Sequence, residues 1–243
     1  MNENELKYLK LKESTKLNNI EISKKLNLGR STIFNYQKKY NLNSDFKRIY
    51  IDKLSLFETS VLVGTLLGDA WLTRASKTSY RGGFSHKIDN KDYVIYKKEL
   101  LSKICVDKIN YKFSNSGYSV DSKQHFVRFK SSPVLKIIYN KIYKNSKKKI
   151  NSFVLNHFTD ISLALYFQDD GSKLKGKNNW YSYKIAMYDY DYESRLNLSK
   201  LLFNKWGIYS SITKVGISIS SRSRLKFKTL ISPYIVDSMK YKL

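Results

Sequence analysis

Two apolar segments about a hundred residues apart constrain the fold of this chain more than any other feature. The first is SVLVGTLLGDAWL (60–72) and the second is DISLALYFQDDGSKL (160–174). Each is typical of a buried helix that ends at an acidic residue, and each is followed by the same succession of periodic segments. The 243-residue chain is therefore predicted to contain two structurally equivalent units.

Each unit is predicted to follow the order αββαββα, with helices packed on an antiparallel sheet. After the opening helix and a first strand, the first unit has strands at 80–88, 109–115 and 125–131 and helices at 89–104 and 132–145; the second has strands at 180–188, 208–214 and 217–220 and helices at 189–203 and 221–232. Runs of strands and helices in this order predict an α+β fold with two pseudo-symmetric units.

The domain organisation follows from the repeat. We expect an N-terminal helical segment over residues 1–45, a first unit over 46–145 and a second unit over 159–243. Between the units, residues 146–158 contain a triple lysine and are predicted to form a basic linker.

The N-terminal segment has the pattern of a helix-turn-helix. In IEISKKLNLGRSTIFNYQKKY (20–40) one helix runs to about Asn27, a turn lies at Leu28-Gly29, and a second helix begins near Arg30. The glycine is expected to let the second helix cross the first, with Ile33 and Phe34 packed inward. Side chains predicted to reach DNA are Arg30, Ser31, Thr32, Asn35, Lys38 and Lys39. The alternative is a helical hairpin packed on the main body, with a solvated basic face.

Charge defines the partner class. The chain has 45 Lys and Arg against 20 Asp and Glu, a formal net charge of +25, which favours a polyanionic partner such as nucleic acid. We find no apolar run long enough to span a membrane and no signal peptide. A single cysteine and the lack of CxxC pairs exclude an internal disulfide and zinc modules, and favour an intracellular, reducing compartment.

The opening helices both end at an acid, Asp69 and Asp170, which lie 101 residues apart. A carboxylate at a helix C-terminus is disfavoured by the helix dipole, so its occurrence in both repeats points to function. Gly64, Gly68 and Ala164 would let the two helices approach closely and bring the acids together, where a divalent cation would relieve their repulsion. The alternative is that these are turn-forming acids without a chemical role.

The predicted strands would present a basic, polar face suited to a long duplex. The residues expected to bind DNA there are Arg74, Arg81, Lys87, Arg128, Lys130, Lys173, Lys175, Lys184 and Lys214.

The segments LVGTLLGDA (62–70) and LALYFQDDG (163–171) resemble the two signature motifs of LAGLIDADG homing endonucleases of the single-chain type, here preceded by the helix-turn-helix. The resemblance implies that Asp69 and Asp170 are catalytic and bind metal, with contributions from Gly68 and Asp169, whose backbone carbonyls would help to coordinate metal or water. It also implies a basic residue beside each half of the site, for which Lys148 and Lys242 match best. Lys147 and Lys149 fit the first position by spacing as well.

The resemblance further implies a monomeric endonuclease that uses Mg²⁺ or Mn²⁺ to cut both strands of a long asymmetric DNA site, leaving short 3′ overhangs, in the homing of an intron. The compartment would be the cytoplasm of a prokaryotic or phage host, or a mitochondrion. Two alternatives stay open within the same fold: a maturase that binds intron RNA, and a DNA-binding regulator that does not cut. A basic structural or membrane-surface protein is a third.

Overall fold

The computed structural model describes residues 3–14, 19–39, 54–114, 122–176 and 180–243. The chain forms two compact units, Met1–Tyr50 and Ile51–Leu243. The predicted boundary between residues 45 and 46 falls outside the described residues.

The described part of the N-terminal unit consists of helices α1 (Glu3–Ser14), α2 (Asn19–Leu26) and α3 (Arg30–Lys39). Its small core consists of Tyr8, Ile22, Ile33 and Tyr36, with four partly buried leucines packed around it. The core side chains come from all three helices, so the second helix of the predicted motif is held by contacts on one face.

Two details of this unit differ from the sequence prediction. Asn27, rather than Gly29, has the left-handed backbone conformation of the turn, with φ 51°. The side chain of Asn tolerates this conformation better than most, so the turn does not depend on the glycine. Phe34 is exposed, whereas Tyr36 is buried in its place, because the face that carries Ile33 continues at Tyr36, three residues further along the helix.

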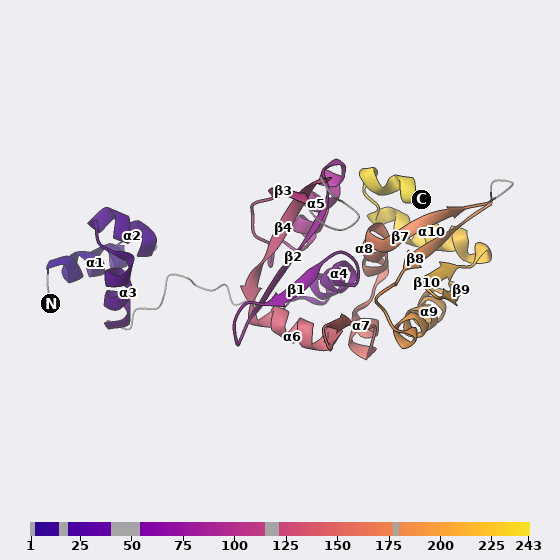
Figure 1. Ribbon diagram of the computed structural model, residues 1–243, viewed down its shortest axis with the longest axis horizontal. Helices are drawn as coiled ribbons and strands as arrows, with labels where there is room; N and C mark the ends of the chain where they lie inside the picture. The colour runs from indigo at the N-terminus through magenta and orange to yellow at the C-terminus, as the bar shows by residue number, and fades with distance from the viewer. Residues whose placement is uncertain (1–2, 15–18, 40–53, 115–121, 177–179) are drawn as a thin grey trace. The chain divides into compact units, whose positions relative to one another are not determined.

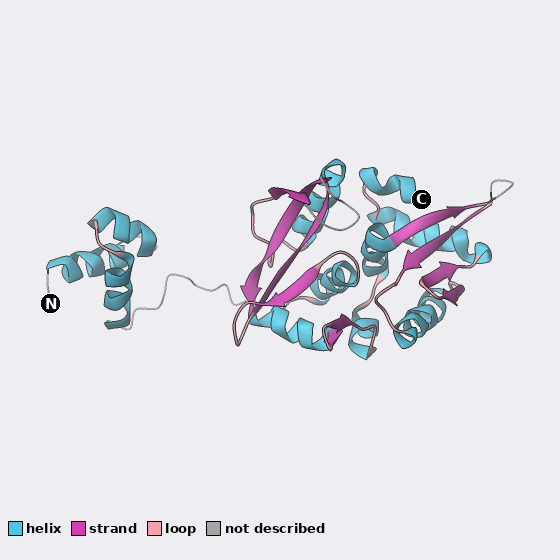
Figure 2. Cartoon of the chain, viewed as in Figure 1, coloured by secondary structure: helices cyan, strands magenta, loops and turns pink. Residues whose placement is uncertain are grey.

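The larger unit has the predicted order of elements twice (Figure 1). The first repeat contains α4 (Leu56–Leu67), β1 (Trp71–Arg74), β2 (Tyr80–Lys87), α5 (Lys91–Leu100), β3 (Asn110–Ser114), β4 (Ser122–Ser132) and α6 (Pro133–Ile142). The second contains α8 (Asp160–Asp170), β7 (Gly171–Lys175), β8 (Tyr181–Ala186), α9 (Tyr192–Trp206), β9 (Ser210–Thr213), β10 (Gly216–Ile219) and α10 (Arg224–Ile231). Both sheets are antiparallel with equivalent strand orders, β1-β2-β4-β3 and β7-β8-β10-β9 (Figure 2).

Strand alternation gives each sheet a core face and a polar face. On β2, Gly82, Phe84 and His86 are buried, whereas Arg81 and Lys87 are exposed on the other side. The second sheet repeats this division, because Ser172 of β7 pairs with Lys184 of β8, which pairs in turn with Ser218 of β10. The polar face carries Arg81, Lys87 and Arg128 among its residues in the first sheet, and Ser172, Lys184 and Ser218 in the second.

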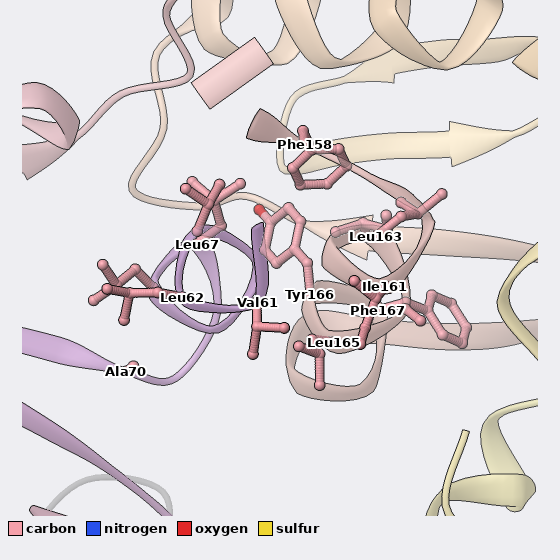
Figure 3. Packing of buried hydrophobic residues seen from close by; sticks show 14 of the residues in the cluster. Val61, Leu62, Leu67, Ala70, Phe158, Ile161, Leu163, Leu165, Tyr166 and Phe167 are labelled. Carbon is pink, nitrogen blue, oxygen red and sulfur yellow. The ribbon is translucent and has the colours of Figure 1, made fainter. Parts of the chain in front are cut away.

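The opening helices α4 and α8 lie side by side between the sheets (Figure 1). A Cβ atom on Gly64 would lie 2.5 Å from the carbonyl oxygen of Ser162, so the close approach predicted at Gly64 is confirmed, with Ser162 rather than Ala164 as the contacted residue. The Ser162 hydroxyl donates to the Ser60 carbonyl at 2.7 Å. Val61 and Tyr166 lie between the two helices (Figure 3), and both are fully buried.

The range predicted as a basic linker, 146–158, has regular structure. It contains strand β6 (Lys147–Lys148), which pairs with β5 (Tyr143–Lys144) in a hairpin, and helix α7 (Ser152–His157). The buried side chains of Ile150, Val154 and Phe158 attach it to the main core, so its apolar residues outweigh the lysine run. The described residues of this unit also include the short 3₁₀ segments η1 (Ile88–Asn90), η3 (Ser221–Ser223), η4 (Ser232–Tyr234) and η5 (Asp237–Lys242). Among the described helices, none has the length and apolarity needed to cross a bilayer.

Candidate active site

The acids of the two motifs meet at the ends of the paired helices. Helix α4 ends at Leu67 and Gly68 caps it, so Asp69 directly follows the helix, whereas Asp170 is the last residue of α8. Both aspartates line one pocket, together with Lys148 and Tyr190. The repeat therefore delivers one carboxyl from each unit to a shared pocket.

The carboxyls of Asp69 and Asp170 share an environment that disfavours their charge. Burial, followed by the negative charge of Asp169, raises the pKa of Asp69 to about 6. Burial, followed by the charges of Asp69 and Asp169, raises the pKa of Asp170 to about 7. Neighbouring carboxyls whose charged forms are disfavoured in this way are stabilised by a nearby cation.

Two lysines support the helix ends in equivalent ways. The Lys148 ammonium donates to the carbonyl oxygens of Gly68 at 2.7 Å and Ala70 at 3.0 Å. The Lys242 ammonium donates to the carbonyl oxygens of Gln168 at 2.5 Å and Asp169 at 3.1 Å. Burial lowers the pKa of both lysines, and the nearby aspartates oppose this shift. Each ammonium has three N–H donors, so one remains beyond these two bonds.

Asp169 occupies the centre of a buried polar cluster. Its side chain is 0% exposed, and both carboxylate oxygens accept hydrogen bonds from the Lys97 ammonium at 2.8 Å. The Tyr93 hydroxyl donates to Oδ1 at 2.8 Å, and the Asp69 backbone N–H donates to Oδ2 at 3.1 Å. Burial by itself would raise the pKa of Asp169, but the positive charge of Lys97 and the hydrogen bonds from Lys97 and from the Asp69 N–H hold it below its usual value. Asp169 is therefore a buried, ion-paired carboxylate.

His86 connects this cluster to the pocket. Its Nε2 lies 3.1 Å from the Lys97 ammonium, and its Nδ1 lies 3.4 Å from Oδ2 of Asp69. Burial, followed by the positive charge of Lys97, lowers the pKa of His86 to about 3, so the ring is neutral at physiological pH. A neutral imidazole in contact with Lys97 accepts through Nε2, which leaves the Nδ1–H directed at Asp69.

The donor set fits a hard divalent cation at the pocket. Side-chain atoms of Asp69, His86 and Asp169 lie within 4.8 Å of one another. However, the Lys97 ammonium already neutralises Asp169, and the Asp169 carbonyl oxygen accepts from Lys242. The oxygens that remain are the carboxylates of Asp69 and Asp170, which are of the type that Mg²⁺ and Mn²⁺ prefer.

The residues predicted to bind DNA fall into three groups. Most are exposed: Arg30, Ser31, Asn35 and Lys39 on α3, and Arg74, Arg81, Lys87, Arg128, Lys175, Lys184 and Lys214 in the larger unit. Thr32, Lys130 and Lys173 are half-buried, and the side chain of Lys38 lies outside the described residues.

The sheet register corrects the predicted polar face at three residues. Lys175 pairs with Tyr181 and Arg74 pairs with Tyr80, which places both on the core side of their strands. Lys173 also lies off the polar face. It pairs with Tyr183 in the sheet register, and Tyr183 is buried on the core face. Its ammonium donates to the main-chain oxygen of Leu243 at 2.6 Å and lies 4.7 Å from the centre of the Tyr181 ring. The strand pairing therefore turns Lys173 away from the polar face, which Ser172 and Leu174 occupy instead.

Sequence reasoning missed the residues around Asp169. No sequence motif singles out His86, which lies in the strand predicted at 80–88, and Tyr93 and Lys97 lie in the helix predicted at 89–104. One signal was available, because Tyr93, Val94 and Lys97 share one face of α5 and all three are buried, so Lys97 occupies a core position of an amphipathic helix. A lysine at such a position needs a buried acidic partner.

Comparison with known proteins shows the family to which this chain is related. The sequence profile described as "LAGLIDADG DNA endonuclease family" matches residues 59–229. The chain is 29% identical over 230 residues to the cytochrome b mRNA maturase bI2 of Saccharomyces cerevisiae, covering 86% of this chain and 51% of the maturase. It is 25% identical over 205 residues to the DNA endonuclease I-ChuI of Chlamydomonas applanata, covering 76% of this chain and 94% of that protein.

A solved structure shares the fold. The homing endonuclease I-WcaI, bound to its DNA recognition sequence, superposes with a TM-score of 0.71 and 22% sequence identity, over 83% of this chain and 93% of that one. This chain spans about half the length of the yeast maturase and nearly all of the Chlamydomonas endonuclease. With both motifs inside the matched region, the chain belongs to the LAGLIDADG DNA endonuclease family.

Proposed function

We propose that this protein is a site-specific, double-strand DNA endonuclease that hydrolyses one phosphodiester in each strand. The observation that carries the proposal is the convergence of Asp69 and Asp170, one from each repeat, on a single pocket at the ends of α4 and α8. Each carboxylate would serve one half of a target whose two strands are related by the same pseudo-symmetry.

Asp69 and Asp170 would hold a divalent cation, Mg²⁺ or Mn²⁺. Such a cation, when bound, lowers the pKa of water and stabilises negative charge on the phosphate and the leaving oxygen. Binding requires both carboxyls to be ionised. Because their pKa values are raised to about 6 and about 7, cation affinity should increase as the pH rises from 6 to 8.

Lys148 and Lys242 supply positive charge on either side of the carboxylates. Two donors of each ammonium hold the carbonyl oxygens at the helix ends, so the lysines fix the backbone that carries the acids. The remaining N–H of each would reach a water or a phosphate oxygen, which favours stabilisation of the charge that grows during hydrolysis.

The polar faces of the two sheets would carry the duplex. On the first sheet, the register places Arg128 of β4 opposite Gly83 of β2, between the exposed Arg81 and the half-buried Ser85. Gly83 has no side chain to cover its neighbours on this face, so Arg128 and Arg81 are accessible to phosphates and base edges. Contacts spread over both sheets fit a long asymmetric site.

The N-terminal unit would lengthen that site. Arg30, Ser31 and Asn35 are exposed on α3, the second helix of the helix-turn-helix, which is the element that enters the major groove in proteins of this type. Deleting residues 1–42 should weaken DNA binding and leave the cut position unchanged. A shifted cut would show that this segment does more than anchor the protein.

The proposal is tested by incubating the protein and Mg²⁺ with duplex DNA that spans the insertion site of its own gene, and mapping the ends on both strands. We expect one staggered cut with short 3′ overhangs, and a monomer on DNA by sedimentation. Random nicking, or no cut with tight duplex binding, would contradict the endonuclease and favour a non-cutting DNA-binding protein.

A second candidate function is intron RNA maturation, because the first relative described above is a cytochrome b mRNA maturase. The same basic surface would then bind the folded host intron. Filter binding of the host intron RNA and of the duplex target, at matched salt, separates the two. Cleavage should be lost in Asp170→Asn, whereas RNA binding and splicing should persist.

A prokaryotic cytoplasm or a mitochondrion remains the predicted compartment.

A further inference from the structure

The two halves of the site differ in the buried polar cluster around Asp169, as a comparison of equivalent positions in the two repeats shows. Positions 101 residues apart are equivalent, since Trp71 pairs with Gly83 and Ser172 pairs with Lys184 in the two sheets. By this spacing, Gly68, His86, Tyr93 and Lys97 of the first unit correspond in turn to Asp169, Met187, Ser194 and Leu198 of the second. At the last three positions the first unit has larger polar residues where the second has apolar or small ones, and at the first position the first unit has glycine where the second has an acid.

These four differences form one physical unit. A Cβ atom on Gly68 would lie 2.3 Å from Oδ2 of Asp169, so the Asp169 side chain occupies the space that a side chain at position 68 would need. The carboxylate crosses from α8 into the first unit, where Lys97 and Tyr93 bind it. In the second unit, no acidic side chain crosses from position 68 to the equivalent residues Leu198 and Ser194, because Gly68 has none, and Ser194 contacts Asp191 of its own unit instead.

The cluster ends at one catalytic carboxyl only. Asp169 accepts from the backbone N–H of Asp69 at 3.1 Å, and His86 places Nδ1 3.4 Å from the Asp69 carboxylate. Asp69 therefore has its main chain and its side chain both held by the cluster. The corresponding contacts to Asp170 would have to come from Gly68 and Met187, neither of which has a polar side chain to offer.

We propose, on the basis of the proposed nuclease function, that Asp169 is a positioning residue for Asp69, held in place by Lys97 and Tyr93, and that it acts on the first half of the site. Groups that orient a metal ligand without touching the metal contribute to affinity and rate through the ligand's position. The cluster then fixes the position of Asp69 more tightly than that of Asp170, so the two halves of the site should cut their strands with different sensitivity to changes in the cluster.

The test uses the double variant Lys97→Met/Asp169→Asn, because either single change would leave one buried charge unpaired. The matched control is Leu198→Met, which makes the equivalent change in the second unit. Each protein is given a supercoiled plasmid that carries the target cut by the wild type, with Mg²⁺. Melting temperature and duplex binding in Ca²⁺ are measured on the same samples.

We expect the double variant to melt and bind DNA like the wild type, but to form linear plasmid about 10- to 100-fold more slowly, with nicked circles accumulating. Nicked circles report that one strand is cut more slowly than the other, because both cuts use the shared cation but the first half depends more strongly on how the cluster holds Asp69. Leu198→Met should give linear plasmid as fast as the wild type. A double variant that cuts like the wild type, or that slows without nicked circles, would overturn the proposal.

A Tb³⁺ titration separates this proposal from the function on which it rests. Trp71 lines the same pocket as Asp69 and Asp170 and can sensitise bound Tb³⁺. The double variant should bind Tb³⁺ about tenfold more weakly than the wild type, whether or not the wild type cuts DNA. A wild type that binds Tb³⁺ but cuts no DNA would remove the nuclease function alone, whereas equal Tb³⁺ affinities would remove the positioning role.

If the double variant melts well below the wild type, Tyr93→Phe takes its place. This change removes a single hydroxyl that donates to Asp169 at 2.8 Å and keeps the ring in the core. The same one-sided nicking is expected, to a smaller extent. Linear plasmid formed at the wild-type rate, without nicked circles, would count against the proposal here too.

Discussion

The two repeats of the larger unit have the same order of elements and the same strand order, yet they build their halves of the pocket differently. Around Asp69 lie a buried ion pair, a neutral histidine and a tyrosine, whereas the positions equivalent to His86 and Lys97 are occupied by Met187 and Leu198. Duplication thus preserves the helices and sheets, while the buried side chains near the pocket have diverged. An asymmetric pocket suits a protein whose proposed DNA target is itself asymmetric.

The largest effect on stability is expected at the buried ion pair. Lys97→Met leaves the Asp169 carboxylate buried without its partner, and this should lower the free energy of unfolding by about 3–5 kcal/mol. The equivalent change in the second unit, Leu198→Met, replaces one apolar side chain by another of similar volume and should cost less than about 1.5 kcal/mol. Urea denaturation of both variants measures the difference. Equal losses would show that the two positions are not distinguished by charge.

The contact between the opening helices comes next. Gly64→Ala puts a methyl group 2.5 Å from the Ser162 carbonyl oxygen, so the helices must move apart, at a cost of about 1–3 kcal/mol. Gly29→Ala is the control, because its Cβ would meet only side chains at 3.7 Å. Thermal unfolding should show a lower melting temperature for the larger unit in Gly64→Ala alone. A Gly64→Ala variant as stable as the wild type would refute the tight helix contact.

Replacing Lys148 or Lys242 should slow cleavage to a similar extent, because the two lysines hold the two motif helices in equivalent ways. This differs from Lys97 and its equivalent Leu198, which are not alike in charge. Lys148→Met and Lys242→Met each remove a cation that holds the end of a motif helix, and each should slow cleavage by about 10- to 100-fold. Duplex binding in Ca²⁺ should change little, because one charge among many is lost. Lys147→Met is the control for Lys148, since its side chain is exposed. A larger loss in Lys147→Met would move the assignment to Lys147.

The smallest effect is expected at the helix starts. Asp191 caps α9 by accepting from the Ser194 N–H at 3.0 Å and from Lys149 at 2.5 Å, whereas its equivalent, Asn90, makes no side-chain cap on α5. Asp191→Ala should cost about 1 kcal/mol and Asn90→Ala less than about 0.5 kcal/mol.

This cap also has a pH signature. The hydrogen bond from Lys149, followed by that from Ser194, lowers the pKa of Asp191 to about 2. Its stabilisation is therefore present above the unfolded value of 3.8 and is lost as the pH falls from about 4 toward 2. The stability difference between wild type and Asp191→Ala should shrink over that range. A difference independent of pH would mean that the carboxylate charge plays no part in the cap.

The sequence predicted what depends on local pattern. The motif acids, the order of elements and the helix-turn-helix all follow from periodicity and from a repeat of 101 residues. Lys173 was misplaced because one residue of strand register decides which face a side chain takes. The sequence prediction placed the turn at Gly29, because glycine adopts the left-handed backbone conformation most easily. In the structure Asn27 adopts this conformation instead, as asparagine also can. The cluster around Asp169 joins Lys97 to a partner 72 residues away, and such a contact has no local signature.

The central claim, that one aspartate from each repeat builds a single centre, is tested most directly by a double-mutant cycle of Asp69→Asn and Asp170→Asn. The rates of both strand cuts are measured with Mg²⁺ and end-labelled target. In a shared centre, each single variant should lose cleavage of both strands by at least about a thousandfold, and the double variant should be no worse than either. Single variants that each keep one strand cut at the wild-type rate, with both cuts lost in the double, would show two independent centres and contradict the account.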